Sequence, residues 1–339
     1  MPGPQSPRRR TAGPAPALDP EALGRRLLPP GDPLLRALVR RRPGRVIADT
    51  ALSYAAIFLA FALLARSPAW WAAALAFAVI GNRQYALSVL THEGDHRTLF
   101  ARRGANDLFA QALLCAPVGV DFHGERANHG RHHLLLAGAD DPDRYLYSVE
   151  DKSTRGGFLL FLTGLTMFPR ALRKAIDGGA RPTARLPPGR ALAAFARRRG
   201  GTLVAQGLIF AAIGALFPWW YYLAFWVAPI YPLVFVPHKV RMFCEHAVAV
   251  TPDAAADPAR LITFAPGALE RLLFSPYNLN LHAEHHMWPY VPYYNLGRLR
   301  GLAARCPGIE VRRSYLGFVL GYFRRLPLAP AARAATAPA

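Results

Sequence analysis

The chain has 339 residues, of which 52% are hydrophobic, and its 41 Lys and Arg against 21 Asp and Glu give a formal net charge of +20. The mean hydropathy is nevertheless slightly positive, at +0.12, so long apolar stretches alternate with strongly basic ones. This alternation is typical of a polytopic membrane protein. It argues against a nucleic-acid-binding protein, whose Lys and Arg gather on one polar face. Three widely separated cysteines, Cys115, Cys244 and Cys306, indicate neither a disulfide framework nor a zinc knuckle.

Residues 1–45 are rich in Pro, Arg, Ala and Gly and contain no apolar core of the signal-peptide type. We therefore expect a basic, mostly disordered cytosolic tail there. Residues 46–326 are expected to form one domain, followed by a disordered C-terminal tail at 327–339. Within the domain, apolar runs at about 46–65 and from 68 toward 90 are each long enough to cross ~30 Å of hydrocarbon. They predict a first pair of membrane spans.

A second hairpin is predicted at about 202–237, where two apolar runs flank the turn PWWYY. Each predicted turn carries a tryptophan pair suited to an aromatic belt at one membrane face, Trp70 with Trp71 and Trp219 with Trp220. Lys and Arg crowd the other ends of the spans, so the positive-inside rule puts both turns outside and both termini in the cytosol. We expect an all-α, multi-pass integral membrane protein with four transmembrane helices in two hairpins and a cytosolic helical cap.

The eleven histidines all lie between residues 92 and 286, on the side predicted to be cytosolic. Eight of them form three clusters, HEGDH, HGRHH and HAEHH, which contain His92 and His96, then His129, His132 and His133, then His282, His285 and His286. Spacings of three and four residues bring side chains to one face of a helix. Each cluster can therefore direct its imidazoles toward a common metal centre.

The first cluster alone also matches the His-Glu-x-x-His pattern of zinc proteases. In that alternative, His92 and His96 bind zinc, Glu93 is the general base, and Asp177 is a third ligand. The remaining clustered histidines are then without a role. A metal transporter or sensor is a further alternative, but acidic or histidine-rich tracts of low complexity are more typical of that class.

Boxes of the form H-x-x-x-H, H-x-x-H-H and H-x-x-H-H, separated by paired spans, resemble the membrane fatty acid desaturase and hydroxylase superfamily. The flanking stretches LSVLTHEGDH, RANHGRHHLLLAGADDPD and NLNLHAEHHMWPYVPYYNL agree, and the resemblance covers about residues 50–300. It implies a ninth ligand, the isolated histidine of RMFCEHA on the helix that leaves the last span. The implied metal ligands are His92, His96, His129, His132, His133, His246, His282, His285 and His286. His123 and His238 stay unassigned.

The resemblance implies two iron ions as cofactor and O2 as co-substrate, although imidazole also suits zinc, copper and nickel. We expect no catalytic residue beyond the metal ligands. Nearby carboxylates are expected to accept the free ring N–H groups and to offset part of the metal charge. The candidates are Glu93, Asp95, Asp140, Asp141, Asp143, Glu245 and Glu284.

The implied reaction is O2-dependent introduction of a double bond into a fatty acyl or related lipid chain. Hydroxylation of an alkyl, acyl or carotenoid-like chain on the same scaffold is the alternative, and the PYVPYYNL tail of the third box favours desaturation. The chain lacks the His-Pro-Gly-Gly motif of a fused cytochrome b5. A separate electron donor such as ferredoxin, with its reductase, is therefore implied. Arg83 lies inside the second predicted span, where it either snorkels to the interface or supports the metal site.

Overall fold

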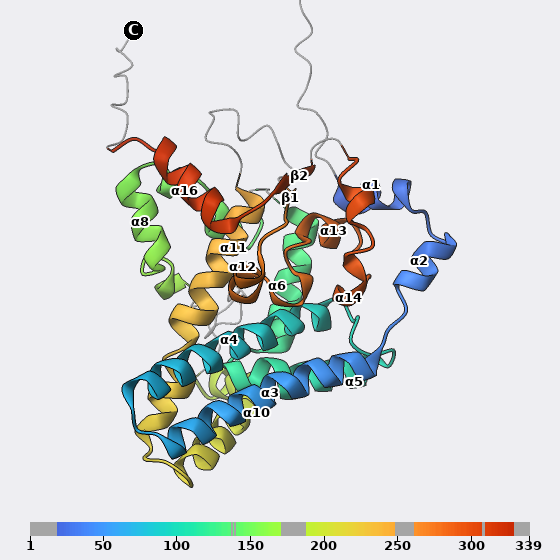
Figure 1. The fold of residues 1–339 in the computed structure, drawn as a ribbon. Helices are drawn as coiled ribbons and strands as arrows, with labels where there is room; N and C mark the ends of the chain where they lie inside the picture. The colour runs from blue at the N-terminus through green and yellow to red at the C-terminus, as the bar shows by residue number, and fades with distance from the viewer. Residues whose placement is uncertain are drawn as a thin grey trace, which may run out of the picture.

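A computed structural model describes residues 19–136, 138, 140–170, 188–247, 261–306 and 309–328. Long helices occupy the lower part of the molecule, and shorter helices with a pair of strands lie above them (Figure 1). The described part of the chain is mostly helical, in agreement with the predicted class. We refer to the upper part as the upper layer.

Three of the described helices are long and apolar enough to cross a membrane. They are α3 (Pro43–Arg66), α4 (Trp70–Asp95) and a continuous helix Tyr222–His246 that consists of η4 (Tyr222–Val227), η5 (Ile230–Phe235) and α11 (Val236–His246). The first two pack against each other as a hairpin. Phe58 and Leu59 on α3 each leave 71% of their surface exposed. Large apolar side chains with this much exposed surface indicate that this side of the helix faces lipid.

The second predicted hairpin differs in detail from the structure. The predicted third span forms the C-terminal part of α10 (Pro188–Gly214). α10 is not among the three described helices that are long and apolar enough to cross a membrane. α10 begins in a basic stretch that includes Arg198 and Arg199. The following long helix continues past Pro237 to His246, as expected for the helix that leaves the last span.

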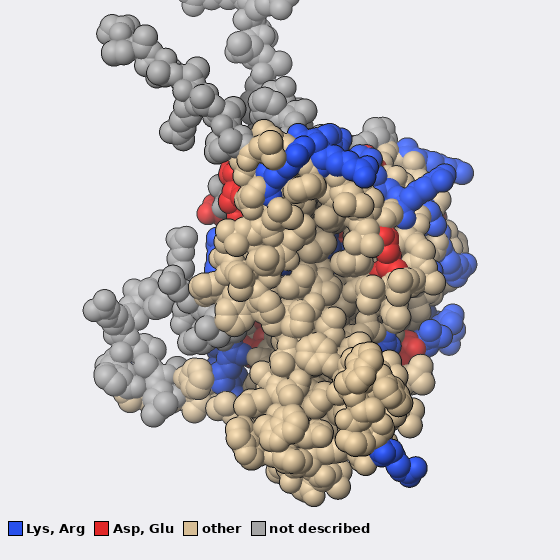
Figure 2. All heavy atoms as spheres, turned by 60° about the vertical axis from the view of Figure 1, so that its left-hand side comes forward, with Lys and Arg blue, Asp and Glu red and all other residues tan. Residues whose placement is uncertain are grey.

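Charged side chains are distributed unevenly along the long axis of the molecule. In Figure 2, Lys and Arg gather on the upper part of the face shown, and the lower part is almost free of charged side chains. Burying a charge in hydrocarbon is costly, so a surface without charges is the one suited to the membrane. The protein is therefore associated with a membrane through its long helices.

The expectation of a disordered N-terminal tail is wrong for residues 20–38. This stretch forms α1 (Pro20–Leu27) and α2 (Pro33–Leu38), each capped at its start by an aspartate side chain. Leu28, Leu35 and Leu38 are buried in one cluster with Met287 and Trp288. Burial of these leucines is the physical reason for order in an otherwise basic, proline-rich segment. Residues 1–18 lie outside the described part of the chain.

One short sheet, which the sequence did not predict, accompanies the helices. β1 (Leu261–Phe264) and β2 (Ile309–Arg312) form a two-stranded parallel sheet in which Leu261 pairs with Ile309. The run LITF is β-branched and aromatic, which favours a strand, and all four residues are buried. β1 packs against α11 and α13, so the strand supports two helices that carry histidines.

The remaining elements are short and lie mostly around the histidines. Their bounds are α5 (Arg103–Phe109), η1 (Ala110–Cys115), η2 (Ala116–Val118), α6 (Phe122–Leu135), α7 (Arg144–Tyr147), η3 (Glu150–Lys152), α8 (Arg155–Thr163), α12 (Ala268–Phe274), η7 (Pro276–Asn278), α13 (His282–Met287), α14 (Tyr293–Leu296), α15 (Arg300–Ala303) and α16 (Tyr315–Arg325). One core lies between α3, α4, η1 and η4. A second core, between α8, α11 and α16, supports the upper layer.

Candidate metal centre

Four helix segments bring the nine predicted histidines together. His92 lies near the end of α4, and His96 caps that end. α6 carries the second histidine box and α13 the third. His246 is the last residue of α11. The nine form two groups: His92, His96, His129, His133 and His285 in the first, and His132, His246, His282 and His286 in the second. Within each group, one ligand atom of every residue lies within 4.8 Å of the others.

Helical geometry explains why each H-x-x-H-H box serves both groups. Residues four apart lie on one face of a helix, whereas adjacent residues are ~100° apart around the axis at 3.6 residues per turn. On α6, His129 and His133 therefore join the first group and His132 the second. On α13, His282 and His286 join the second group and His285 the first.

The imidazole nitrogens are spaced as they would be around a metal ion. In the first group, Nε2 of His92 lies 2.7 Å from Nε2 of His285. In the second group, Nε2 of His282 lies 2.8 Å from Nε2 of His246. Two nitrogens at right angles on a metal with bonds of ~2.0–2.1 Å would be about 3 Å apart. The donor set thus fits a pair of metal ions.

One buried nitrogen supports this fit independently of the spacing. His132 is fully buried, and among the described residues its Nε2 has no hydrogen-bond partner. A buried polar atom without a partner is destabilising and calls for a specific explanation. A metal ion within the second group would supply the missing partner.

The histidines are held in the form that binds metals. Burial, reinforced by the neighbouring imidazoles, lowers the pKa of His129, His133 and His285 well below its ordinary value. Burial lowers the pKa of His96 to about 3, with a further contribution from Arg126. These imidazoles are neutral near pH 7, and the neutral ring is the metal ligand.

Asp141 meets a histidine of the second group directly. Nδ1 of His132 donates to both carboxylate oxygens of Asp141 at 3.0 Å. The hydroxyl of Tyr147 also donates to Asp141, and the backbone N–H of Asp143 donates to Oδ1 of Asp141 at 2.9 Å. The carboxylate is therefore fixed, and it orients the His132 ring so that Nε2 points away from it.

Glu245 lies beside His282, but more loosely than Asp141 beside His132, because among the described residues Nδ1 of His282 makes no hydrogen bond. Its Oε2 lies 3.3 Å from Nδ1 of His282, and its Oε1 accepts a hydrogen bond of 2.8 Å from the hydroxyl of Tyr315. Arg241, one turn earlier on α11, forms a buried ion pair with it. A buried charge of this kind is stable only when it is paired and hydrogen-bonded.

Three of the other five predicted carboxylates accept hydrogen bonds from groups other than histidines. Glu93 accepts hydrogen bonds from Thr98 and Tyr293, Glu284 from Thr263, and Asp143 from Asn128, whereas Asp140 is exposed and Asp95 half-buried. Asp141 and Glu245 thus both lie beside histidines of the second group.

Sequence reasoning missed the residues that hold these two carboxylates. Tyr147 follows Asp141 by six residues, so the DDPDRYLY stretch contained a signal for it. Tyr315 lies 70 residues from Glu245, in a stretch without any histidine. No local pattern could have linked the two.

The zinc-protease alternative does not fit the geometry. His92 and His96 share their group with three further histidines. The carboxylate of Glu93, the base in that alternative, is engaged by Thr98 and by the backbone N–H of Tyr293. Asp177 lies outside the described residues. His123 and His238 belong to neither group.

The fold and the site define a membrane-associated helical protein with a histidine-rich centre able to bind metal ions. The chain belongs to the fatty acid desaturase family, whose model matches residues 68–317. The protein is therefore an oxidoreductase, as the histidine boxes indicated.

Two curated relatives share the name sn-1 acyl-lipid omega-3 desaturase (ferredoxin). The relative from Nostoc sp. is 21% identical over 259 residues, which cover 71% of this chain and 69% of the relative. The relative from Synechocystis sp. is 24% identical over 253 residues, which cover 70% of this chain and 69% of the relative.

Proposed function

We propose that this protein is an O2-dependent di-iron desaturase that introduces a double bond into the acyl chain of a lipid. The observation that carries the proposal is the convergence of nine buried or half-buried histidines into a group of five and a group of four. Imidazole suits iron, and membership of the desaturase family favours iron over the other metals that imidazole binds.

The nine histidines would hold the two iron ions, one in each group. When bound, the iron pair supplies the activation of O2 that an unactivated C–H bond requires. Asp141 would keep the His132 ring oriented and bring negative charge to the second group, and Glu245 lies beside His282. Removal of two hydrogens from adjacent carbons, with reduction of O2 to two waters, takes two electrons from a donor and two protons from solvent.

The membrane arrangement follows from the same proposal. α3, α4 and the helix Tyr222–His246 would span the bilayer, with the C-terminal part of α10 as the fourth span. The basic upper layer, which contains the histidines, would face the cytosol, in line with the positive-inside rule. An acyl chain buried among the long helices could then approach the histidines without leaving the membrane.

The electrons would come from a ferredoxin supplied by its reductase. Both relatives are named as ferredoxin-dependent acyl-lipid desaturases. The upper layer offers exposed arginines on and near α15 and β2, namely Arg300, Arg305 and Arg312. A basic surface suits an acidic electron carrier, and charge complementarity mainly accelerates such association.

Lipid profiling tests the proposed function. Cells that express the protein should gain acyl chains with a new double bond, and cells that express His285→Ala at matched levels should not. A new hydroxyl group in place of the double bond would make the protein a hydroxylase on the same scaffold. Identical lipid profiles in the two strains would contradict the proposal.

A further inference from the structure

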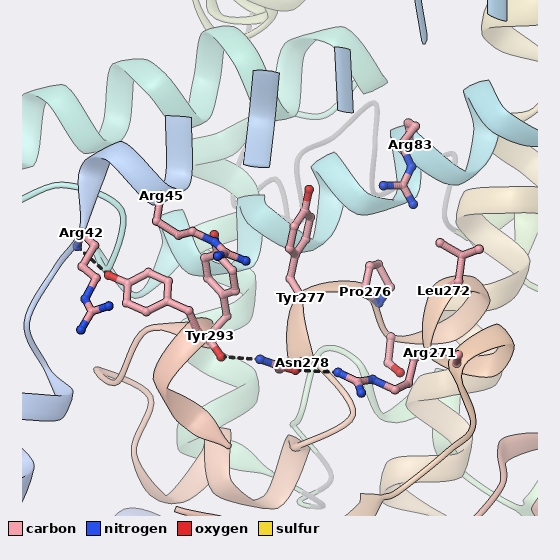
Figure 3. Close-up of a pocket in the computed structure, with 12 residues that line it drawn as sticks. Arg42, Arg45, Arg83, Arg271, Leu272, Pro276, Tyr277, Asn278 and Tyr293 are labelled. Atoms are coloured by element: carbon pink, nitrogen blue, oxygen red, sulfur yellow. Dashed lines mark hydrogen bonds between the residues drawn. The ribbon is translucent and has the colours of Figure 1, made fainter. Parts of the chain in front are cut away.

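A cavity of about 600 Å3 lies where the start of α3 and the middle of α4 meet α12, η7 and α14 (Figure 3). Its lining is unusually basic and aromatic. Four arginines and three tyrosines contribute to it: Arg42, Arg45, Arg83, Arg271, Tyr277, Tyr293 and Tyr294. None of the twelve lining residues is acidic.

The positive charge of this cavity is only partly balanced. Among the described residues, the four arginines make one ion pair, between Arg45 and Asp49 at 2.8 Å. Asp49 also accepts a hydrogen bond from the hydroxyl of Tyr293. One carboxylate beside four guanidinium groups leaves an excess of positive charge, which attracts an anion.

Arg83 is part of this cavity, which explains a charged residue in the middle of a membrane-spanning helix. Its guanidinium donates to the side chain of Asn82, and Asn82 donates in turn to the carbonyl of Leu272 at 2.8 Å. A charge at such a depth is tolerated where it faces a polar cavity and not lipid. Figure 3 shows Tyr277 between Arg83 and Arg45.

The backbone of the cavity wall is strained. Tyr277 and Asn278 both have positive φ, 56° and 61°, although neither is a glycine. Residues in this region cost about 1–3 kcal/mol each and cluster at ligand-binding sites. Asn278 uses this conformation to accept a hydrogen bond from Arg271 at 3.0 Å and to donate one to the carbonyl of Tyr293 at 3.1 Å.

The cavity is connected to the histidines by short structural links. Arg83 precedes His92 by nine residues on α4, a distance of ~14 Å along the axis at ~1.5 Å per residue. The backbone N–H of Tyr293 donates to Glu93, which is the residue next to His92. A ligand group held by the arginines would therefore lie about 14 Å from His92 along α4, where the long helices meet the upper layer.

We infer that this cavity binds the phosphate of the headgroup or carrier to which the acyl substrate is attached. The inference deepens the proposed function and rests on it. Guanidinium groups bind phosphate through paired, charge-assisted hydrogen bonds, and tyrosine hydroxyls can add further donors. The volume is within the range of sites that bind small molecules. The phosphate would fix one end of the substrate, so that the distance from the cavity to the histidines selects the carbons that react.

Direct binding to the purified full-length protein tests this inference without any turnover. The probes are short-chain phosphatidylglycerol, stearoyl-CoA and the neutral lipid monogalactosyldiacylglycerol. The variants are Arg83→Gln combined with Arg271→Gln, the corresponding double Lys variant, and Arg26→Gln on the exposed side of α1 as the matched control.

We expect a phosphate-bearing probe to bind at least tenfold more tightly than the neutral lipid. Loss of charge-assisted hydrogen bonds should weaken its binding about tenfold to a hundredfold in the double Gln variant. The Lys variant should recover part of the affinity, and Arg26→Gln should bind like the wild type. Preference for phosphatidylglycerol identifies a membrane lipid as the source of the phosphate, and preference for stearoyl-CoA identifies a soluble carrier. Equal affinity for the neutral lipid, or unchanged affinity in the double Gln variant, overturns the inference.

Lipid profiling of the same variants separates this inference from the proposed function. If the wild type forms no double bond but phosphate binding depends on the arginines, the reaction is wrong and the cavity is a phosphate site. If the double Gln variant forms the same products in the same lipid classes as the wild type, the reaction stands and the inference is wrong.

Discussion

His132 and His133 are adjacent in the chain, yet their rings are 6.0 Å apart and belong to different histidine groups. The two side chains point ~100° apart around α6 because a helix has 3.6 residues per turn. A histidine doublet at the end of a box thus allows one helix to serve two metal ions. The same arrangement recurs on α13 with His285 and His286.

His132→Ala and His133→Ala should each weaken a different metal position. Each substitution removes a ligand from one group only. We therefore expect the iron in that group to be lost and the iron in the other group, about one per chain, to remain. Metal analysis of the purified variants measures this. His123→Ala, an exposed position on the same helix, is the control and should retain the wild-type iron content. Loss of all iron in both variants would contradict two separate positions.

His246→Ala should lower bound iron and eliminate activity, although His246 lies outside the three boxes. It is buried at the end of α11, and its Nε2 is 2.8 Å from Nε2 of His282. The effect is measured as iron content and double-bond formation in membranes at matched expression. His238→Ala, two turns earlier on the same helix, should retain substantial amounts of both. Full activity of His246→Ala would leave a site of eight histidines.

Asp141→Asn should reduce metal affinity or activity about 10–100-fold, the range typical of carboxylates that orient a metal-binding histidine. The asparagine side chain has nearly the same shape, but it lacks the negative charge of the carboxylate that accepts the hydrogen bond from Nδ1 of His132. The neighbouring Asp140 is exposed, so Asp140→Asn is the matched control and should behave like the wild type. Equal effects of the two substitutions would remove the special role of Asp141.

Gly24→Ala should destabilise the protein by about 1–3 kcal/mol, the usual effect of overpacking. A Cβ at this position would lie 2.2 Å from the carbonyl oxygen of Met287, at the end of the helix that carries the third box. Thermal unfolding in detergent measures the loss. A Cβ at Gly44 would meet nothing within 4 Å, so Gly44→Ala should leave the unfolding temperature nearly unchanged. An unaffected Gly24→Ala would mean that α1 does not pack against α13.

The eight histidines of the three boxes were predictable because their signal is local, whereas His246 was implied only by the resemblance to the desaturase family. Residues three and four apart on a helix can be recognised in the sequence alone, and apolar runs of sufficient length predict membrane helices. The distribution of the nine histidines between two groups was not predictable, because it depends on how α4, α6, α11 and α13 are placed relative to one another. The sequence thus predicted which residues come together but not which share a group.

The features that were missed depend on contacts distant in sequence. Trp288 donates to the carbonyl of Gly24, 264 residues away. β1 and β2, which pair through Leu261 and Ile309, have only four residues each. Strands this short show no alternating pattern that could be recognised in the sequence. Leucines in a basic, proline-rich segment become ordered only because α13 offers them an apolar surface. Composition alone therefore predicted disorder where the folded protein has two helices.

The metal content of the purified protein tests the central claim most directly. Nine histidines in two groups should hold about two iron ions per chain after expression in iron-replete medium. The same preparation should contain little zinc. One tightly bound zinc ion per chain, with no iron, would contradict the di-iron account.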